Sequence, residues 1–216
     1  MDALPGIRYS SAILAAAGAN GLDPAFLAAV AAQETGGPGA DSGANVVGDR
    51  GHGHGLFQID DRYHAFARTP GAADPAQNAA YAAGLLGGLL ERNGGNVRAA
   101  LSAYNAGSPN ALGAVTTWPD GAQLGYADSV LRHYAAIRSE VQQRALDELP
   151  TTSADVNQLG SYAGQIPQVT LPAFTPPNWS FTSYASESDK GGGKLAATSD
   201  QAMAALVDPS DDPESR

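Results

Sequence analysis

A glutamate stands where its carboxyl group could act as a general acid. Residues 31–37 (AAQETGG) place Glu34 in the last turn of a predicted apolar helix, just before two glycines. Partial burial and the negative end of the helix dipole both favour the protonated carboxyl group and so raise its pKa. A general acid that works near neutral pH needs such a pKa. An exposed glutamate in a last helical turn would look the same, so the neighbouring motifs decide the interpretation.

Three further motifs follow Glu34 along the chain. Residues 48–64 read GDRGHGHGLFQIDDRYH and combine alternating glycines with carboxylates and histidines. Residues 103–107 read AYNAG, and residues 125–127 read GYA. A single motif of small residues could arise by coincidence, but four motifs in a fixed order are specific.

These motifs resemble two related enzyme families. Residues 48–64 resemble the segment of goose-type lysozymes in which Gly-Asp-Arg-Gly leads into Gly-Leu-Met-Gln-Val-Asp. The GLFQI core is similar to the second motif of soluble lytic transglycosylases, with Phe57 in place of the usual Met. AYNAG is identical to the transglycosylase motif, and Gly125-Tyr126-Ala127 resembles the closing Tyr motif. In both families the acid is a Glu followed by Ser or Thr and Gly, which Glu34 matches.

The resemblance covers residues 24–134 and implies a mainly α, lysozyme-like domain that cleaves peptidoglycan. The bond cut would be the β-1,4 bond between MurNAc and GlcNAc, with Glu34 as the catalytic acid. Asp49 and Asp60 match positions at which goose-type lysozymes carry aspartates implicated in water activation. In inverting glycosidases a second carboxylate activates water about 6.5–9.5 Å from the acid. The two aspartates therefore favour hydrolysis, with Asp60 assisted by Asp49.

A different product stays open, because lytic transglycosylases need no second carboxylate. In those enzymes the C6 hydroxyl of MurNAc attacks internally and leaves a 1,6-anhydro end. Asp49 would then only make a turn, and Asp60 would only cap a loop. A chitinase-like activity on GlcNAc polymers is a further alternative that related folds allow.

Six residues are predicted to hold the glycan. Gly55 would let the backbone approach a sugar, which a Cβ would prevent. Gln58 offers both a donor and an acceptor to hydroxyl or N-acetyl groups. Tyr104 and Tyr126 can present ring faces to a pyranose while their hydroxyls stay polar. The set is completed by Asn105, which can bind an acetamido group, and His64, which matches a goose-type histidine of the groove.

No metal or cofactor is predicted. His52 and His54 have a spacing that can ligate zinc, and His64 and several aspartates lie nearby. The chain has no cysteine and no His-Glu-x-x-His motif. In the goose-type pattern these two positions hold Asn and an aromatic residue, so both histidines are interpreted as substitutions in a turn.

Local signals divide residues 1–150 into helices around an irregular insert. Asp23-Pro24 and Asp74-Pro75 each give an N-cap followed by proline at the first helical position. We expect helices over about 7–19, 24–34, 75–92, 96–105 and 125–145. The last of these carries one apolar stripe, formed by Val130, Tyr134, Ile137 and Val141. Residues 40–68, rich in Gly, Asp and His, fit short strands or turns.

Residues 151–216 have the composition of an extended or disordered tail rather than of a second domain. Prolines, a triple glycine and terminal acids are poor core formers. Residues 166–184 mix prolines with large apolar residues, which predicts an arm that lies on a protein partner. We therefore predict a catalytic domain over 1–150 and a tail over 151–216. The partner could be a phage virion, tail or injection particle that carries the domain as structural component or cargo.

Charge and hydropathy exclude other classes of function. The net charge of −10 argues against a nucleic-acid partner. No segment is long and apolar enough to span a bilayer. Residues 7–19 make a poor signal peptide because their apolar run is mostly alanine. We expect a protein made in the cytoplasm without a signal peptide, which reaches the wall after release or delivery.

Overall fold

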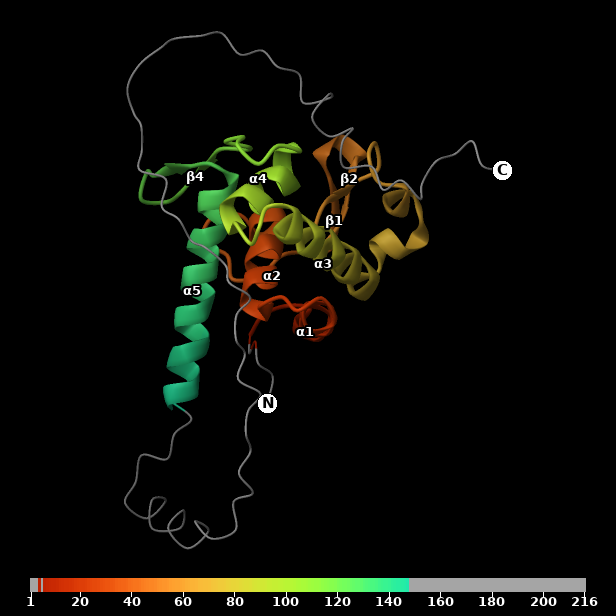
Figure 1. Ribbon diagram of the computed structural model, residues 1–216. Helices are drawn as coiled ribbons and strands as arrows, with labels where there is room; N and C mark the ends of the chain where they lie inside the picture. Colours follow the sequence, from red (N-terminus) through yellow and green to blue (C-terminus); the bar gives the residue numbers. More distant parts are fainter. Residues whose placement is uncertain (1–3, 5, 148–216) are drawn as a thin grey trace, which may run out of the picture.

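The computed structural model describes residue 4 and residues 6–147, which form a mainly helical domain with a small β insert (Figure 1). The predicted tail over 151–216, its arm and the domain boundary at 150 lie outside the described residues. The helices are α1 (Ser10–Ala19), α2 (Pro24–Ala31), α3 (Pro75–Arg92), α4 (Val97–Ala106) and α5 (Tyr126–Asp147).

Helix α2 forms the centre of the domain. It contacts α1 and α5, and Figure 1 shows it between α5 on one side and α3 on the other. All residues from Ala25 to Ala31 are buried, because the helix is apolar on every face. Its start follows the predicted signal: the side chain of Asp23 accepts a 2.8 Å hydrogen bond from the Ala25 N–H, and Pro24 occupies the first turn.

Helices α3 and α4 also begin where their caps predict. Asp74 accepts from the backbone N–H groups of Ala76 and Gln77 at the start of α3, and Asn96 caps α4. The apolar stripe of α5 is confirmed. Its members lie buried in the core or packed against it: Val130, Tyr134, Ile137 and Val141.

The insert between α2 and α3 contains a three-stranded antiparallel sheet. Strands β1 (Val46–Gly48), β2 (Gly53–Gly55) and β3 (Ile59–Asp60) lie in chain order. Three short 3-10 helical turns lie in the same insert: η2 (Asp49–Gly51), η3 (Ala65–Arg68) and η4 (Pro70–Ala73). The predicted small β insert is therefore confirmed, and its strands are as short as the glycine-rich sequence implies.

A buried asparagine fastens the insert to α3. Asn78 is 0 % exposed. Its Oδ1 accepts from the Phe57 N–H at 2.9 Å, and its Nδ2 donates to the carbonyl oxygens of His54 and Ala72. A buried amide with all three contacts made stabilises this junction, because buried polar groups need hydrogen-bond partners.

Two local features differ from the sequence-based expectation. The helix expected over 24–34 ends as an α-helix at Ala31 and continues as a π-helical turn, η1 (Ala32–Gly36), closed by a bond from the Gly37 N–H to the Ala32 carbonyl. A hairpin of β4 (Thr116–Thr117) and β5 (Gln123–Leu124) precedes α5 and was not expected.

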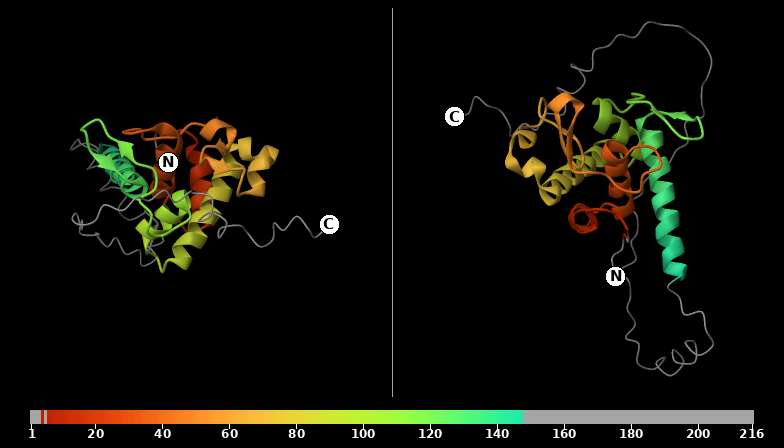
Figure 2. Two further views of the ribbon diagram at one scale, coloured as in Figure 1. Left: turned by 90° about the horizontal axis from the view of Figure 1, so that it is seen from above. Right: turned by 180° about the vertical axis from the view of Figure 1, so that it is seen from behind.

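The β insert and this hairpin lie at the same end of the molecule, on opposite sides of α2 (Figure 2). Within the part of the chain that the structure describes, no helix is both long and apolar enough to cross a membrane.

Candidate active site

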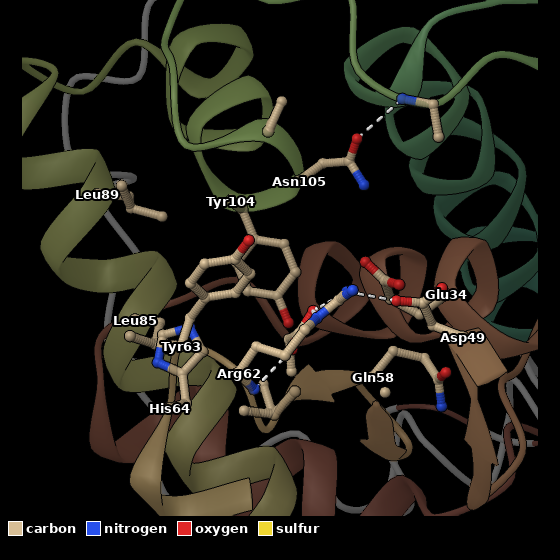
Figure 3. A pocket seen from close by; sticks show the side chains of 15 residues that line it. Glu34, Asp49, Gln58, Arg62, Tyr63, His64, Leu85, Leu89, Tyr104 and Asn105 are labelled. Carbon is tan, nitrogen blue, oxygen red and sulfur yellow. Dashed lines mark hydrogen bonds and ion pairs between the residues drawn. The ribbon is translucent and has the colours of Figure 1, made fainter. Parts of the chain in front are cut away.

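A pocket of about 410 Å³ lies where the C-terminal end of α2 meets the β insert and α4 (Figure 3). Its volume is in the range of ligand sites. Polar and titratable side chains from separate elements converge on it. The polar and aromatic residues that line it are Glu34, Asp49, Gln58, Asp60, Arg62, Tyr63, His64, Tyr104 and Asn105.

The π-helical turn places Glu34 at the pocket wall. Thr35, the next residue, fixes this turn against the insert: its hydroxyl contacts the carbonyl oxygens of Ala31 and Leu56 at 3.1 Å and accepts from the Ala44 N–H at 2.8 Å. Glycine is required beside it, because a Cβ on Gly43 would lie 2.4 Å from the Thr35 hydroxyl. Gly36 is required as well, because a Cβ there would lie 2.4 Å from the Ser42 carbonyl oxygen.

The carboxyl group of Glu34 is tuned to hold a proton. Glu34 keeps part of its surface open to the pocket, but burial raises its pKa from 4.5 to about 7. A hydrogen bond from Tyr126 opposes this shift, because it favours the ionised carboxylate. A carboxyl group of this kind can donate a proton near neutral pH.

Tyr126 lies behind Glu34 rather than in the pocket. Its hydroxyl donates a 2.5 Å hydrogen bond to Glu34 Oε1, and the residue is only 1 % exposed. Its ring stacks on that of Tyr104 with the centroids 6.4 Å apart. The sequence predicted that Tyr126 holds the glycan; the structure places its hydroxyl on the acid, since packing of α5 against the core buries the ring.

Asp60 and Asp49 meet at one cation. Arg62 donates to both oxygens of Asp60, from Nε at 2.9 and 3.1 Å and from Nη2 at 2.5 Å. The same Nη2 donates to Asp49 Oδ2 at 2.5 Å. Burial acts to raise the pKa of Asp60, but the hydrogen bonds and charge of Arg62 outweigh it and the pKa is lowered.

The backbone under these carboxylates is strained. Asp49, Arg50 and Gln58 all have positive φ, at 42°, 57° and 49°. Such conformations cost about 1–3 kcal/mol each in residues other than glycine, and they gather at functional sites. Three residues with such conformations lie in one short insert. This indicates that the backbone geometry of the insert serves a functional site at a cost in local stability.

Gln58 lies across the hairpin of β1 and β2. Its Nε2 donates to the carbonyl oxygens of Val46 and Gly55, at 3.1 and 2.9 Å. A Cβ on Gly48 or Gly53 would lie within 2.5 Å of the Gln58 Oε1, so both glycines make room for this amide. Gln58 lines the pocket, and its donor is occupied by the backbone.

The remaining predicted ligands surround the opening. Asn105 Oδ1 accepts from the Ala114 N–H at 2.8 Å, and its Nδ2 points toward the pocket (Figure 3). Tyr104 lines the pocket while its hydroxyl donates to the Phe57 carbonyl at 3.0 Å. His64 forms a hydrogen bond between its Nδ1 and the Tyr81 hydroxyl at 3.1 Å.

Gly55 has a different reason for being glycine from the one predicted. It is absent from the pocket lining, and its φ is +79°. A Cβ there would lie 2.3 Å from Asn78 Nδ2 and 2.5 Å from the Ala72 carbonyl oxygen. Gly55 therefore allows β2 to pack on α3, and its contact with a sugar stays a prediction.

The two insert histidines share one carboxylate outside the pocket. His52 Nδ1 lies 2.8 Å from Asp61 Oδ1, and His54 Nε2 lies 3.2 Å from Asp61 Oδ2. Across the residues that the structure describes, no group of three or more His, Asp or Glu is arranged to hold a metal ion.

A comparison with family models decides the family. The model described as the transglycosylase SLT domain matches residues 11–118, which is half of the chain. The chain belongs to the SLT transglycosylase family. No solved structure matches it significantly.

As an SLT domain, the chain is a glycosidase or lytic transglycosylase that acts on peptidoglycan. Its lysozyme-like, mainly helical fold agrees with the predicted fold class. The matched range contains Glu34, Asp49, Asp60 and the AYNAG motif, and it ends before Tyr126.

Sequence reasoning missed two residues of this SLT domain. Arg62 was read only as part of the 48–64 motif, although it contacts both aspartates in the pocket. The spacing of two residues between Asp60 and Arg62 could have indicated a contact between their side chains. Asn78 looked like an ordinary residue of a helix, and only the tertiary structure reveals that it holds the insert.

Proposed function

We propose that this SLT domain is an inverting muramidase that hydrolyses the MurNAc–GlcNAc β-1,4 bond. One observation carries the proposal: two carboxyl groups of a single pocket have pKa values shifted in opposite directions. Burial raises the pKa of Glu34 to about 7, and Arg62 lowers that of Asp60. Such a separation supports one acid and one ionised carboxylate at the same pH.

The proposed reaction uses each group in its favoured state. Glu34 gives its proton to the glycosidic oxygen as the bond to the MurNAc anomeric carbon breaks. A water attacks that carbon from the opposite face and gives a proton to Asp60, with Asp49 beside it. The sugar gains a hydroxyl, and the proton on Asp60 returns to Glu34 through solvent.

The glycan would lie among the polar groups of the rim. The Nδ2 of Asn105 suits the carbonyl oxygen of an acetamido group, since its Oδ1 already binds Ala114. His64 and the ring of Tyr104 border the same opening. Gln58 adds its Oε1 as an acceptor for a hydroxyl or an N-acetyl N–H.

A lytic transglycosylase reaction is the second candidate, and a specific observation favours it. Both oxygens of Asp60 already accept hydrogen bonds from Arg62. If neither oxygen were available to a water, the MurNAc C6 hydroxyl would attack instead and form the 1,6-anhydro product. Glu34 would then serve first as acid and afterwards as base.

Digestion of purified peptidoglycan tests the proposal, with products read by mass spectrometry. The wild type should release muropeptides with reducing MurNAc ends. Glu34→Gln should release none, and Asp60→Asn should lose about 10²-fold or more of the rate. Exclusive 1,6-anhydro ends would instead establish the second candidate. Release of soluble products from chitin but not from peptidoglycan would contradict both.

Delivery to the wall is a separate proposal that rests on residues 151–216. Their mixture of prolines and aromatic residues suits an arm bound to a carrier particle. Deletion of 151–216 should abolish co-sedimentation with that particle and leave catalysis intact. Unchanged co-sedimentation would contradict it.

A further inference from the structure

The pocket contains one strong cation, which the reaction described above does not use. Arg62 is the only arginine or lysine among the described residues that line it. Its side chain extends across the pocket toward Asp49 (Figure 3). A guanidinium in a sugar-binding pocket needs a reason, because the glycan atoms at the scissile bond carry no charge for it to bind.

The contacts of Arg62 are made to carboxylates on two separate elements. Asp60 ends β3, and Asp49 begins the η2 turn. The Nη2 atom lies 2.5 Å from an oxygen of each. Without a shared cation, two carboxylates held this close would repel, and one of them would tend to hold a proton.

The backbone turn at residues 60–62 brings the Asp60 carboxylate and the Arg62 guanidinium together. Asp60 Oδ1 accepts from the Arg62 backbone N–H at 2.8 Å as well as from Nε. This turn orients the Asp60 carboxylate, which is 15 % exposed, while Arg62 remains 44 % exposed. The planar fork of arginine reaches two acceptors at once, which a lysine ammonium cannot do with the same geometry.

We propose that Arg62 is a positioning residue for hydrolysis, which holds Asp60 and Asp49 together so that they can take the proton of one water. The inference rests on the proposed function, because only a hydrolase needs this water. It assigns Arg62 no contact with substrate. Its effect is on the geometry and ionisation of the two carboxylates.

The electrostatics support this role. Burial and the charge of Asp61 raise the pKa of Asp60, and only the contacts with Arg62 lower it. Loss of the Arg62 side chain therefore leaves only the backbone N–H of residue 62 to lower this pKa, against burial and the charge of Asp61. Other titratable groups around this cluster come from the pocket and from the flanking turns: Glu34, Asp49, Tyr63, His64 and Tyr104.

The test compares pH profiles of kcat/KM for the wild type, Arg62→Gln, Arg62→Lys and Arg68→Gln on peptidoglycan fragments. Arg68 provides a matched control, because its Nε donates to the Asp61 carbonyl in the same insert but does not line the pocket. In Arg62→Gln the acidic limb of the kcat/KM profile should move to higher pH by about one to three units, because the pKa of Asp60 rises. Arg62→Lys should restore part of that shift, and Arg68→Gln should not move the limb.

The split between kcat and KM adds a second readout. Because the proposal gives Arg62 no contact with the sugar, Arg62→Gln should lower kcat at pH 6 by about tenfold or more. KM should stay within about twofold of the wild-type value. A wild-type acidic limb in Arg62→Gln, or an equal shift in Arg68→Gln, would overturn the inference.

Failure of this inference and failure of the proposed function give different results. If Glu34→Gln and Asp60→Asn are inactive while Arg62→Gln keeps the wild-type profile, only the role of Arg62 is wrong. If the wild type forms only 1,6-anhydro products, the hydrolase proposal fails and takes the role of Arg62 with it.

Discussion

The hydroxyl of Tyr126 lies 2.5 Å from Oε1 of Glu34, although 92 residues separate them in the chain. Glu34 lies in the π-helical turn that follows α2, and Tyr126 begins the last helix. Burial raises the pKa of Tyr126 well above 10, so its hydroxyl stays protonated and acts as the donor. The contact therefore restrains the carboxyl group and moderates the effect of its burial.

Removal of that hydroxyl should make Glu34 a weaker acid. The hydrogen bond lowers the pKa of Glu34, so Tyr126→Phe should raise this pKa above about 7. The alkaline limb of kcat/KM should move upward by about one pH unit, because a hydrogen bond to a charged group contributes roughly 1.5–3 kcal/mol.

Tyr104→Phe is the matched control for this prediction. Its hydroxyl donates to the Phe57 carbonyl and not to Glu34, so its alkaline limb should stay at the wild-type position. A limb in Tyr126→Phe that stays in place or moves to lower pH would show that the hydrogen bond does not tune the acid.

The buried acid should reduce stability at alkaline pH. Between pH 4.5 and about 7 the unfolded chain has lost the Glu34 proton while the folded protein keeps it, so the free energy of unfolding falls as pH rises. The difference between 7 and 4.5 is 2.5 units, or about 3 kcal/mol at most. Glu34→Gln lacks this penalty.

Urea unfolding of the wild type and Glu34→Gln at pH 4 and pH 8 measures the effect. The variant should gain roughly 1–3 kcal/mol relative to the wild type between the two pH values. A difference that does not change with pH would contradict the raised pKa.

Gly55 should tolerate no side chain, because two costs add there. Its φ of +79° strains any other residue, and an added Cβ would lie 2.3 Å from Asn78 Nδ2. Gly55→Ala should therefore lower the free energy of unfolding by about 2–5 kcal/mol.

Gly94→Ala separates the two costs. Gly94 has a φ of +59° and open space around its Cα, so alanine should cost only about 1 kcal/mol there. Equal losses in the two variants, measured by urea unfolding, would mean that the packing of β2 on α3 is unimportant.

Sequence predicted those features that depend on a few neighbouring residues. The caps Asp23, Asp74 and Asn96 act within three positions, and each starts a helix where predicted. The lysozyme-like fold was predicted from the four motifs, which occur along the chain in the order typical of the family. The π-helical turn could not be predicted, since it depends on the contact of Thr35 with the Leu56 carbonyl, 21 residues away.

The missed parts of the site share a physical cause. The Arg62–Asp49 contact spans 13 residues and depends on the hairpin of the insert. The β4–β5 hairpin has two residues in each strand, too few for an alternating pattern. Whether Tyr126 faced the groove or the core depended on how α5 packs, and its sequence motif was the same for both.

The central claim is that Glu34 holds its proton close to neutral pH, and a carboxyl titration tests it without substrate. The chain has six glutamates. In protein labelled with 13C-glutamate, the Glu34 carboxyl signal is identified by its loss in Glu34→Gln and followed by NMR from pH 3 to 9. The account predicts a midpoint at about 7. A midpoint near the ordinary value of 4.5 would contradict it.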